Sequence, residues 1–160
     1  MRTADARARC IAAVAGALLA GCAGGADAPA DLPDPVEYAQ QLFEGTNAQR
    51  VEAGLEPLEW SECILPVAQE RVHVVAVTGE LEHAPLMAPC APGATVGENL
   101  SRAAELPGSI VEQWMESAGH EANILNPAFQ SVAVACVEPE EDGGPVTCSW
   151  VAEGESPESD

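Results

Sequence analysis

The sequence has no lysine and few aromatic residues. Its six basic residues are all arginines and face 26 aspartates and glutamates, which gives a formal net charge of -20 over 160 residues. Such a chain repels phosphate backbones and anionic membrane surfaces, so we expect no nucleic-acid partner and no electrostatic membrane binding by the folded domain. With only three tryptophans, one tyrosine and two phenylalanines, the core has to be mainly aliphatic. Because 47% of the residues are hydrophobic, the chain as a whole is not a disordered acidic polymer.

The first 21 residues have the pattern of an export signal. A start with three arginines precedes an apolar run over residues 11–21, which is too short to cross a membrane as a helix. The run ends in Leu19-Ala20-Gly21-Cys22, which resembles a bacterial lipobox. This resemblance implies cleavage before Cys22 and a lipid on its sulfur, so we expect an exported protein anchored to the outer face of the cell membrane. The alternative is an ordinary secretory signal in which Cys22 is incidental.

Composition divides the remaining chain into three parts. Residues 22–34 are small and rich in glycine and proline, which predicts a flexible tether. Residues 35–153 are expected to form one domain, and residues 154–160 an acidic, disordered tail.

The cysteine count predicts two disulfides in the domain. Of the six cysteines, one lies in the signal and one is expected to carry lipid, which leaves Cys63, Cys90, Cys136 and Cys148. An exported protein forms disulfides. Cys136 and Cys148 flank a Gly/Pro-containing hairpin turn at equal distances from Asp142, so they should lie opposite each other and pair. Cys63 and Cys90 then pair by elimination, and the absence of CxxC spacing argues against a cysteine metal site.

Hydrophobic periodicity predicts helices followed by strands. A first helix should begin after the cap Asp34 and end before Gly54, a second should cover residues 61–78, and a third residues 105–117. Pro66 conflicts with the first turn of the second helix, which alternatively begins there. Residues 120–125 are expected to add a short helical turn, and residues 129–137 and 146–153 two strands with two apolar faces. These elements predict an α/β fold: an α/β/α sandwich with a short antiparallel sheet between helices.

Three histidines and one short polar segment could carry chemistry. His73 falls in the second helix, where a packed or surface role is expected, whereas His83 falls in the following loop. Gly97-Glu98-Asn99-Leu100 is a short polar segment before an apolar helix. By itself, Glu98 could be only a negative charge near the N-terminus of that helix. His120 could by itself cap the end of the third helix.

Taken in order, these segments resemble a known family. Asn47-x-x-Arg50 in the first helix is followed by a loop histidine, Gly97-Glu98-Asn99, and the segment W-M-x-S-x-G-H-x-A-N-I-L over residues 114–125. The set covers residues 36–153 and resembles the bacterial branch of the CAP superfamily of cysteine-rich secretory, antigen 5 and pathogenesis-related proteins. The resemblance implies the same α/β/α sandwich. Arg50 is expected to brace the fold and to need a carboxylate partner.

The resemblance also implies a surface cleft lined by two histidines and two glutamates. His83, Glu98 and His120 match three of these residues. The second glutamate has no equivalent, because Ser117 stands where relatives carry it. Glu121 stands where bacterial relatives usually have arginine, which disfavours an anionic ligand in the cleft.

Neutral imidazoles beside a carboxylate suit a divalent metal such as zinc, or calcium, held by His83 and His120. The resemblance implies a non-enzymatic binding module for a metal, a small apolar ligand or an envelope component. One alternative is a metal-dependent hydrolase acting on envelope peptide or peptidoglycan material, with Glu98 and a histidine as general base. Another is a partner-binding domain with a vestigial cleft. No serine lies in a nucleophile motif and the domain cysteines are expected to be bonded, so nucleophilic catalysis is not supported.

Overall fold

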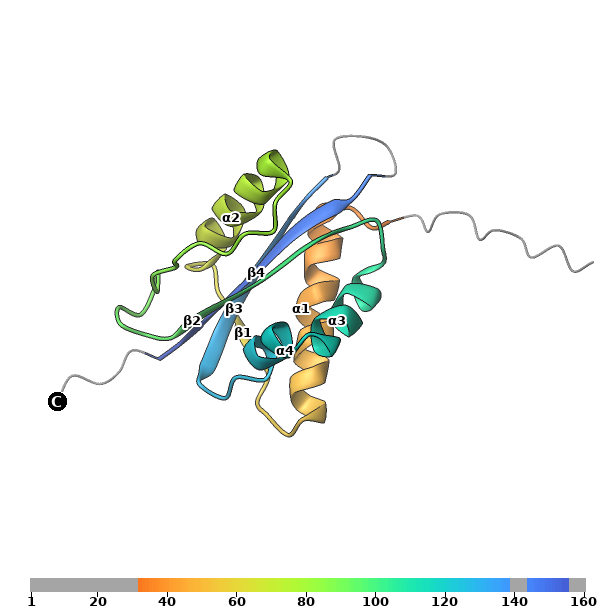
Figure 1. The fold of residues 1–160 in the computed structure, drawn as a ribbon. Coiled ribbons are helices and arrows are strands. Elements are labelled where there is room, and N and C mark those ends of the chain that lie inside the picture. The colour runs from red at the N-terminus through yellow and green to blue at the C-terminus, as the bar shows by residue number, and fades with distance from the viewer. Residues whose placement is uncertain (1–31, 139–143, 156–160) are drawn as a thin grey trace, which may run out of the picture.

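The structure is a computed structural model that describes residues 32–138 and 144–155. Over these residues the chain forms four helices and four strands (Figure 1). The elements are α1 (Pro35–Glu52), β1 (Glu59–Trp60), α2 (Leu65–Thr78), β2 (Val96–Ala103), α3 (Pro107–Glu116), α4 (Ala118–Ile124), β3 (Phe129–Val137) and β4 (Val146–Gly154). The predicted signal, the lipidation residue Cys22 and nearly all of the predicted tether and tail lie outside the described residues.

The strands form one sheet in the order β1-β3-β4-β2. β4 pairs antiparallel with β3 on one side and with β2 on the other, whereas β1 pairs parallel with β3. The two long strands predicted at the C-terminal end are confirmed. The parallel pair is an addition that the sequence analysis did not predict.

Helices cover both faces of this sheet (Figure 1). The alternation of side chains along β3 explains why: Val132 and Val134 join the core cluster formed with α1, α3 and α4, whereas Ala133 and Ala135 join the cluster formed with α2. The small alanines allow α2 to pack closely on its face. The predicted α/β/α sandwich is therefore confirmed.

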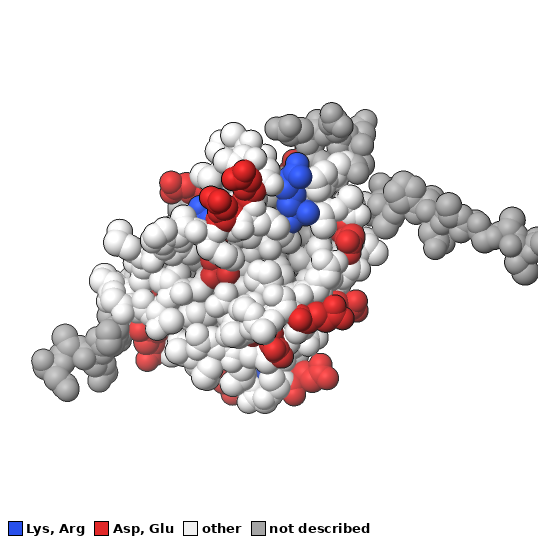
Figure 2. All heavy atoms as spheres, viewed as in Figure 1, with Lys and Arg blue, Asp and Glu red and all other residues white. Residues whose placement is uncertain are grey.

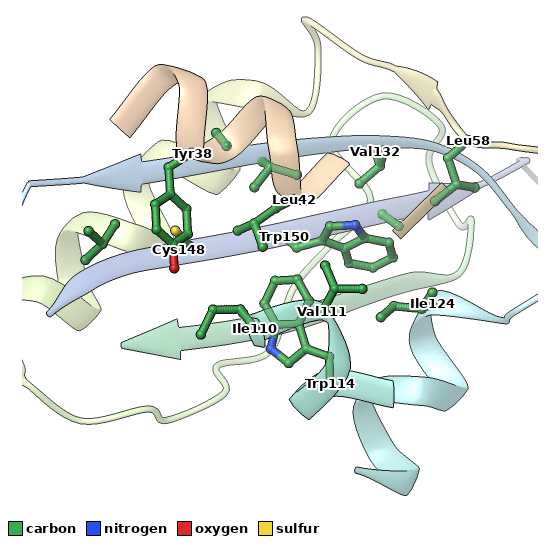
Figure 3. Packing of buried hydrophobic residues seen from close by; sticks show 14 of the residues in the cluster. Tyr38, Leu42, Leu58, Ile110, Val111, Trp114, Ile124, Val132, Cys148 and Trp150 are labelled. Atoms are coloured by element: carbon green, nitrogen blue, oxygen red, sulfur yellow. The ribbon is translucent and has the colours of Figure 1, made fainter. Parts of the chain in front are cut away.

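The larger core cluster is built around the aromatic residues (Figure 3). Trp150 on β4 is fully buried, and its indole N–H donates to Thr46 Oγ1 on α1 at 3.2 Å. Tyr38 is also buried, and its hydroxyl donates to the backbone oxygen of Glu105 at 2.7 Å. Burial, and then the charge of Glu105, raise the pKa of Tyr38 to about 12. Each buried aromatic polar group thus has a partner, which removes the cost of burying it.

Local signals placed two helix ends correctly, whereas the third helix begins at Pro107 rather than at residue 105. The Asp34 carboxylate accepts from the backbone N–H groups of Val36 and Glu37, and Gly79 ends α2 in the left-handed conformation, as expected from their types. The prediction that α2 starts at Ser61 is wrong. Pro66 lies in the first turn of a helix that begins at Leu65, where its missing N–H costs nothing.

Gly97-Glu98-Asn99-Leu100 belongs to strand β2, so the alternative that Glu98 is only the N-terminal charge of a helix is wrong. β2 is an edge strand, and side chains from the neighbouring helices cover its outer side. The Trp114 indole donates to the Leu100 oxygen at 3.2 Å, and the Asn123 amide donates to the Glu98 oxygen at 2.9 Å. These bonds occupy backbone carbonyls that would otherwise invite pairing with another strand.

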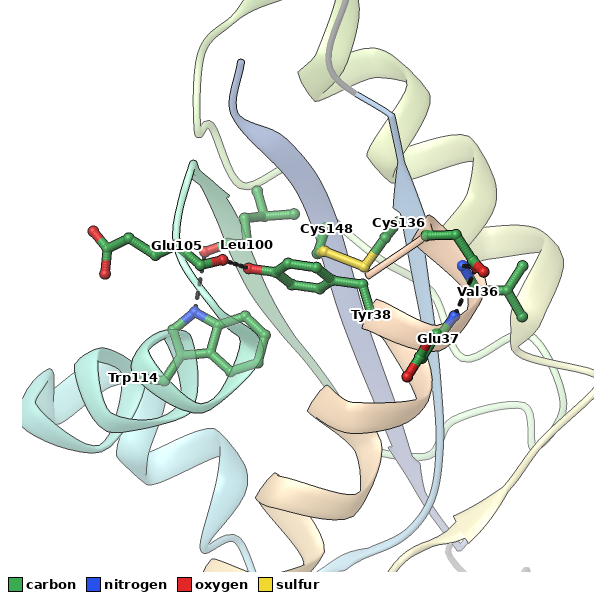
Figure 4. The surroundings of a disulfide bond; sticks show 9 residues. Val36, Glu37, Tyr38, Leu100, Glu105, Trp114, Cys136 and Cys148 are labelled. Carbon is green, nitrogen blue, oxygen red and sulfur yellow. Dashed lines mark hydrogen bonds between the residues drawn. A yellow bond between two sulfur atoms is a disulfide. The ribbon is translucent and has the colours of Figure 1, made fainter. Parts of the chain in front are cut away.

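Both predicted disulfides are present. Cys136 and Cys148 are directly opposite each other in the β3–β4 register, with Cα atoms 4.1 Å apart, and their bridge lies beside the Tyr38 ring (Figure 4). Cys63 and Cys90 form the second bridge. It joins the turn before α2 to the loop after α2, which carries His83.

Arg50 is buried, but its expected carboxylate partner does not exist among the described residues. The guanidinium donates instead to four backbone oxygens, those of Glu56, Ile124, Asn126 and Phe129, at 2.8–3.3 Å. Burial lowers the pKa of Arg50 from its ordinary value. The side chain therefore joins α1 to the end of α4 and the start of β3 through carbonyl dipoles rather than through an ion pair.

Candidate functional site

Three predicted site residues from separate parts of the chain line one surface hollow. His83 comes from the loop after α2, Glu98 from β2 and His120 from α4. The hollow has a volume of about 370 Å³, and Gly97 and Asn123 also line it. The ring centroids of His83 and His120 are 6.4 Å apart. We call this hollow the cleft.

Glu98 is the buried carboxylate of the cleft, and it binds two partners at once. Its Oε1 accepts from Arg71 Nε at 2.6 Å, and its Oε2 lies 2.8 Å from Nδ1 of His83. Arg71 Nη2 also approaches Oε2 at 3.3 Å. Arg71 comes from α2 and supplies the positive charge that a buried carboxylate needs. The result is a chain of contacts, Arg71–Glu98–His83, that fixes the orientation of the imidazole.

His120 lies in the first turn of α4 and also lines the cleft. Burial, and then the nearby His83, lower the pKa of His120 from its ordinary value. Its imidazole is therefore neutral at physiological pH and keeps a nitrogen lone pair. The backbone oxygen of His120 accepts from the Asn99 amide at 3.2 Å, which ties α4 to β2.

The Gly97-Glu98-Asn99 motif has a steric explanation in this fold. A Cβ on Gly97 would lie only 2.6 Å from a ring carbon of Phe129, so glycine is needed for the close approach. Asn99 is fully buried, and its side-chain oxygen accepts from Asn123 at 2.9 Å. The glycine and asparagine thus place β2 against its neighbours, while Glu98 between them points into the cleft.

The loop that presents His83 is held at several points. Arg71 Nη2 donates to the Glu82 backbone oxygen at 2.7 Å, one residue before His83. Further along, the buried Glu153 carboxylate accepts from the backbone N–H groups of Cys90 and Ala91. Together with the Cys63–Cys90 bridge, these contacts fix a loop that has no regular secondary structure.

Comparison with known proteins identifies the fold family. The family model described as "CAP: Cysteine-rich secretory protein family" matches residues 43–151. The chain belongs to the CAP family. It is 32% identical to the uncharacterized protein YkwD of Bacillus subtilis over 110 residues, which cover 63% of this chain but only 43% of that protein. The chain therefore matches less than half the length of this relative.

Solved structures share the CAP fold at low sequence identity. An outer surface protein of Borrelia burgdorferi superposes with a TM-score of 0.62 at 15% identity, over 74% of this chain and 94% of that one. An extracellular protein of Bacillus anthracis containing an SCP domain gives 0.62 at 20% identity, over 76% and 41% of the two chains. A cysteine-rich secretory protein of Staphylococcus aureus gives 0.60 at 17%, over 76% and 40%. At these identities the likeness shows a common fold alone.

Two charged residues near the cleft, Arg71 and Glu153, were not predicted from the sequence. Arg71 follows Ile64 and Ala68 at helical spacing, so an arginine on the apolar stripe of α2 was the available signal. Glu153 is the one charged residue of strand β4, which is a similar signal. Neither Glu112 nor Glu116 replaces the family's second glutamate, because both are exposed on α3 and neither lines the cleft. His73, expected to be packed or on the surface, is exposed on α2.

The CAP cleft offers a metal two protein ligands rather than three. Among residues 32–138 and 144–155, no group of three or more His, Cys, Asp or Glu side chains is arranged to hold a metal ion. Tetrahedral zinc with Zn–N bonds of about 2 Å brings two imidazole centroids to about 5 Å, so the rings at 6.4 Å would have to approach by about 1 Å. The His83 side chain is 54% exposed, so burial does not prevent a small movement about its contact with Glu98. The two imidazoles thus fit an open site that water or a ligand would complete.

Proposed function

We propose that this CAP domain is an exported binding module whose cleft holds a divalent metal through His83 and His120. The observation that carries the proposal is the contact between Nδ1 of His83 and Glu98 at 2.8 Å. A metal-binding histidine typically donates its other ring N–H to a carboxylate, which fixes the tautomer. This contact leaves Nε2 of His83 available, beside a neutral His120.

Zinc suits this site better than calcium. Calcium requires six to eight oxygen ligands, whereas zinc accepts imidazole nitrogen. The one carboxylate in the cleft already binds Arg71 and His83, so few oxygens remain for calcium. With two protein ligands, the ion would keep open positions for an envelope component or another small ligand.

The same geometry favours binding over hydrolysis. A metal-dependent hydrolase needs a base that can take a proton from the attacking water. Glu98 is only 6% exposed and is held by a guanidinium, so it is poorly placed for that role. We therefore keep the binding module as the main proposal.

Isothermal titration of the purified protein with zinc, in excess magnesium, tests this function. His83→Ala and His120→Ala should each weaken zinc binding by at least tenfold, because each removes one of two protein ligands. His73→Ala is the matched control, since this histidine is exposed on α2 outside the cleft, and it should bind zinc within about twofold of the unmodified protein. Equal losses in all three variants, or unchanged binding in the two cleft variants, would contradict the proposal.

We further propose export and lipid anchoring through Cys22. Three observations support export: the signal pattern, the two disulfides, and the membership in a family of secretory proteins. Two structural neighbours are an outer surface protein and an extracellular protein, which agrees with export. No helix within the described part of the chain is both long and apolar enough to span a membrane. Cys22→Ser should move the protein from the membrane to the soluble fraction, and a processed variant that stays with the membrane would refute the lipid anchor.

A further inference from the structure

A second cavity adjoins the cleft. It has a volume of about 230 Å³ and lies between the outer side of β2, the loop residue Leu81 and helix α3. His120 lines both cavities, so the second cavity borders the cleft. Leu100, Ile110 and Trp114 supply apolar walls, whereas Ser101, Arg102, Gln113 and Ser117 supply polar groups. The metal site proposed above shares only His120 with this cavity.

Arg102 gives the cavity a charge that is rare in this protein. The described chain has three arginines and no lysine, and two of the arginines, Arg50 and Arg71, are buried and hydrogen-bonded. Arg102 is exposed and makes no ion pair or hydrogen bond within the described residues. Acidic groups are more numerous than basic ones on the face shown in Figure 2. The neighbouring Glu105 carboxylate accepts from Gln113 rather than from Arg102.

We propose that this cavity binds the free carboxylate end of a peptide whose last residue is aliphatic. The carboxylate would bind the Arg102 guanidinium, which can donate two parallel hydrogen bonds. The last side chain would lie against Trp114 and Ile110. The preceding residues would run along the edge of β2 toward His120.

The lining of the cavity favours a peptide end over a plain acyl chain. The cavity volume of about 230 Å³ equals the liquid volume of about eight water molecules, which is room for one amino-acid residue. The serine and glutamine side chains in the wall can bond to peptide amides, which a fatty acid lacks. Most of the acidic surface repels an anionic ligand, whereas the guanidinium of Arg102 attracts it. The carboxylate is therefore expected to bind beside Arg102.

N-acetyl-leucine and N-acetyl-leucinamide form the probe pair, because they differ in the carboxylate charge. Nuclear magnetic resonance of the indole N–H groups reports the place of binding. Trp114 lines the cavity, while Trp60 and Trp150 do not and serve as internal controls. The titration is run with a chelator present, so its outcome does not depend on the proposed metal site.

N-acetyl-leucine should shift the Trp114 signal saturably and bind about fivefold more tightly than the amide, a factor typical of a partly exposed ion pair. Arg102→Gln should remove this difference. Gln69→Glu changes the net charge equally at an exposed position of α2 and should preserve it. Leu81→Ser, which opens the apolar wall, should weaken both probes.

Three results would overturn the proposal: no saturable Trp114 shift, equal binding of acid and amide, or a preference for the acid that survives Arg102→Gln. Octanoate that shifts the Trp114 signal and binds more tightly than N-acetyl-leucine would also refute the proposal, because the cavity would then prefer an acyl chain to a peptide end.

Discussion

Replacing Arg71 by methionine tests the buried charge pair of the cleft. The Arg71 and Glu98 side chains are 10% and 4% exposed, with Nε and Oε1 2.6 Å apart. Methionine retains much of the aliphatic stem, so the substitution mainly removes the charge and its hydrogen bonds. Removing one partner of a buried ion pair costs about 3–5 kcal/mol, because the other charge stays buried. We expect about 3 kcal/mol, the lower end of the range for such pairs, since His83 still contacts the carboxylate.

Urea unfolding with the disulfides intact measures this loss through the midpoint and the slope. Arg102→Met is the matched control: the same substitution at an exposed, unpaired arginine should change the free energy of unfolding by less than about 0.5 kcal/mol. Glu98→Met alone should also destabilise the protein. The double variant of Arg71 and Glu98 should lose at least about 1.5 kcal/mol less than the sum of the single losses, since it leaves no unpaired charge.

Two outcomes would refute this reasoning. If Arg71→Met and Arg102→Met cost the same, burial does not strengthen the pair. If the losses of Arg71 and Glu98 add within about 0.5 kcal/mol, the two groups do not interact energetically, and the view that Arg71 holds Glu98 in place for His83 is wrong.

Three further predictions concern the surroundings of the cleft. Gly97→Ala should lower the free energy of unfolding by about 1–3 kcal/mol in urea titrations, because the new Cβ would meet the Phe129 ring at 2.6 Å. Replacing Cys63 and Cys90 together by serine should cost about 3–4 kcal/mol from loop entropy and also weaken zinc binding, whereas removing the hairpin disulfide should leave zinc binding unchanged. Because the pKa of His120 is lowered below 6.5, the unfolded chain takes up a proton that the folded chain does not as pH falls through that value. The free energy of unfolding should therefore decrease there, and His120→Gln should flatten that part of the pH profile.

The elements that were predicted correctly depend on nearby residues. Asp34 and Gly79 mark helix ends through their own side-chain and backbone properties. The hairpin spacing alone placed Cys136 opposite Cys148. The family resemblance, rather than any local pattern, brought the two cleft histidines and Glu98 into consideration together.

The errors arose where partners come from distant parts of the chain. β2 has a polar sequence, and it is a strand because β4 pairs with its whole length and because Trp114 and Asn123 cover its outer carbonyls. The buried Arg50 is satisfied by carbonyl groups that its own segment does not supply in full. Propensity does not contain such information, since it describes one segment at a time.

The sequence by itself determined the acidic character, the export pattern, the disulfide pairing and the layered α/β fold. Composition, residue spacing and hydrophobic periodicity indicate these features, and each of them can be read without knowing which distant segments come into contact. Only the tertiary structure decided that Arg71 holds Glu98, that Glu98 orients His83, and that the one exposed arginine of the described chain borders an apolar cavity. These relations depend on the packing of α2, β2 and α3 against one another, and they join residues that are far apart in the sequence.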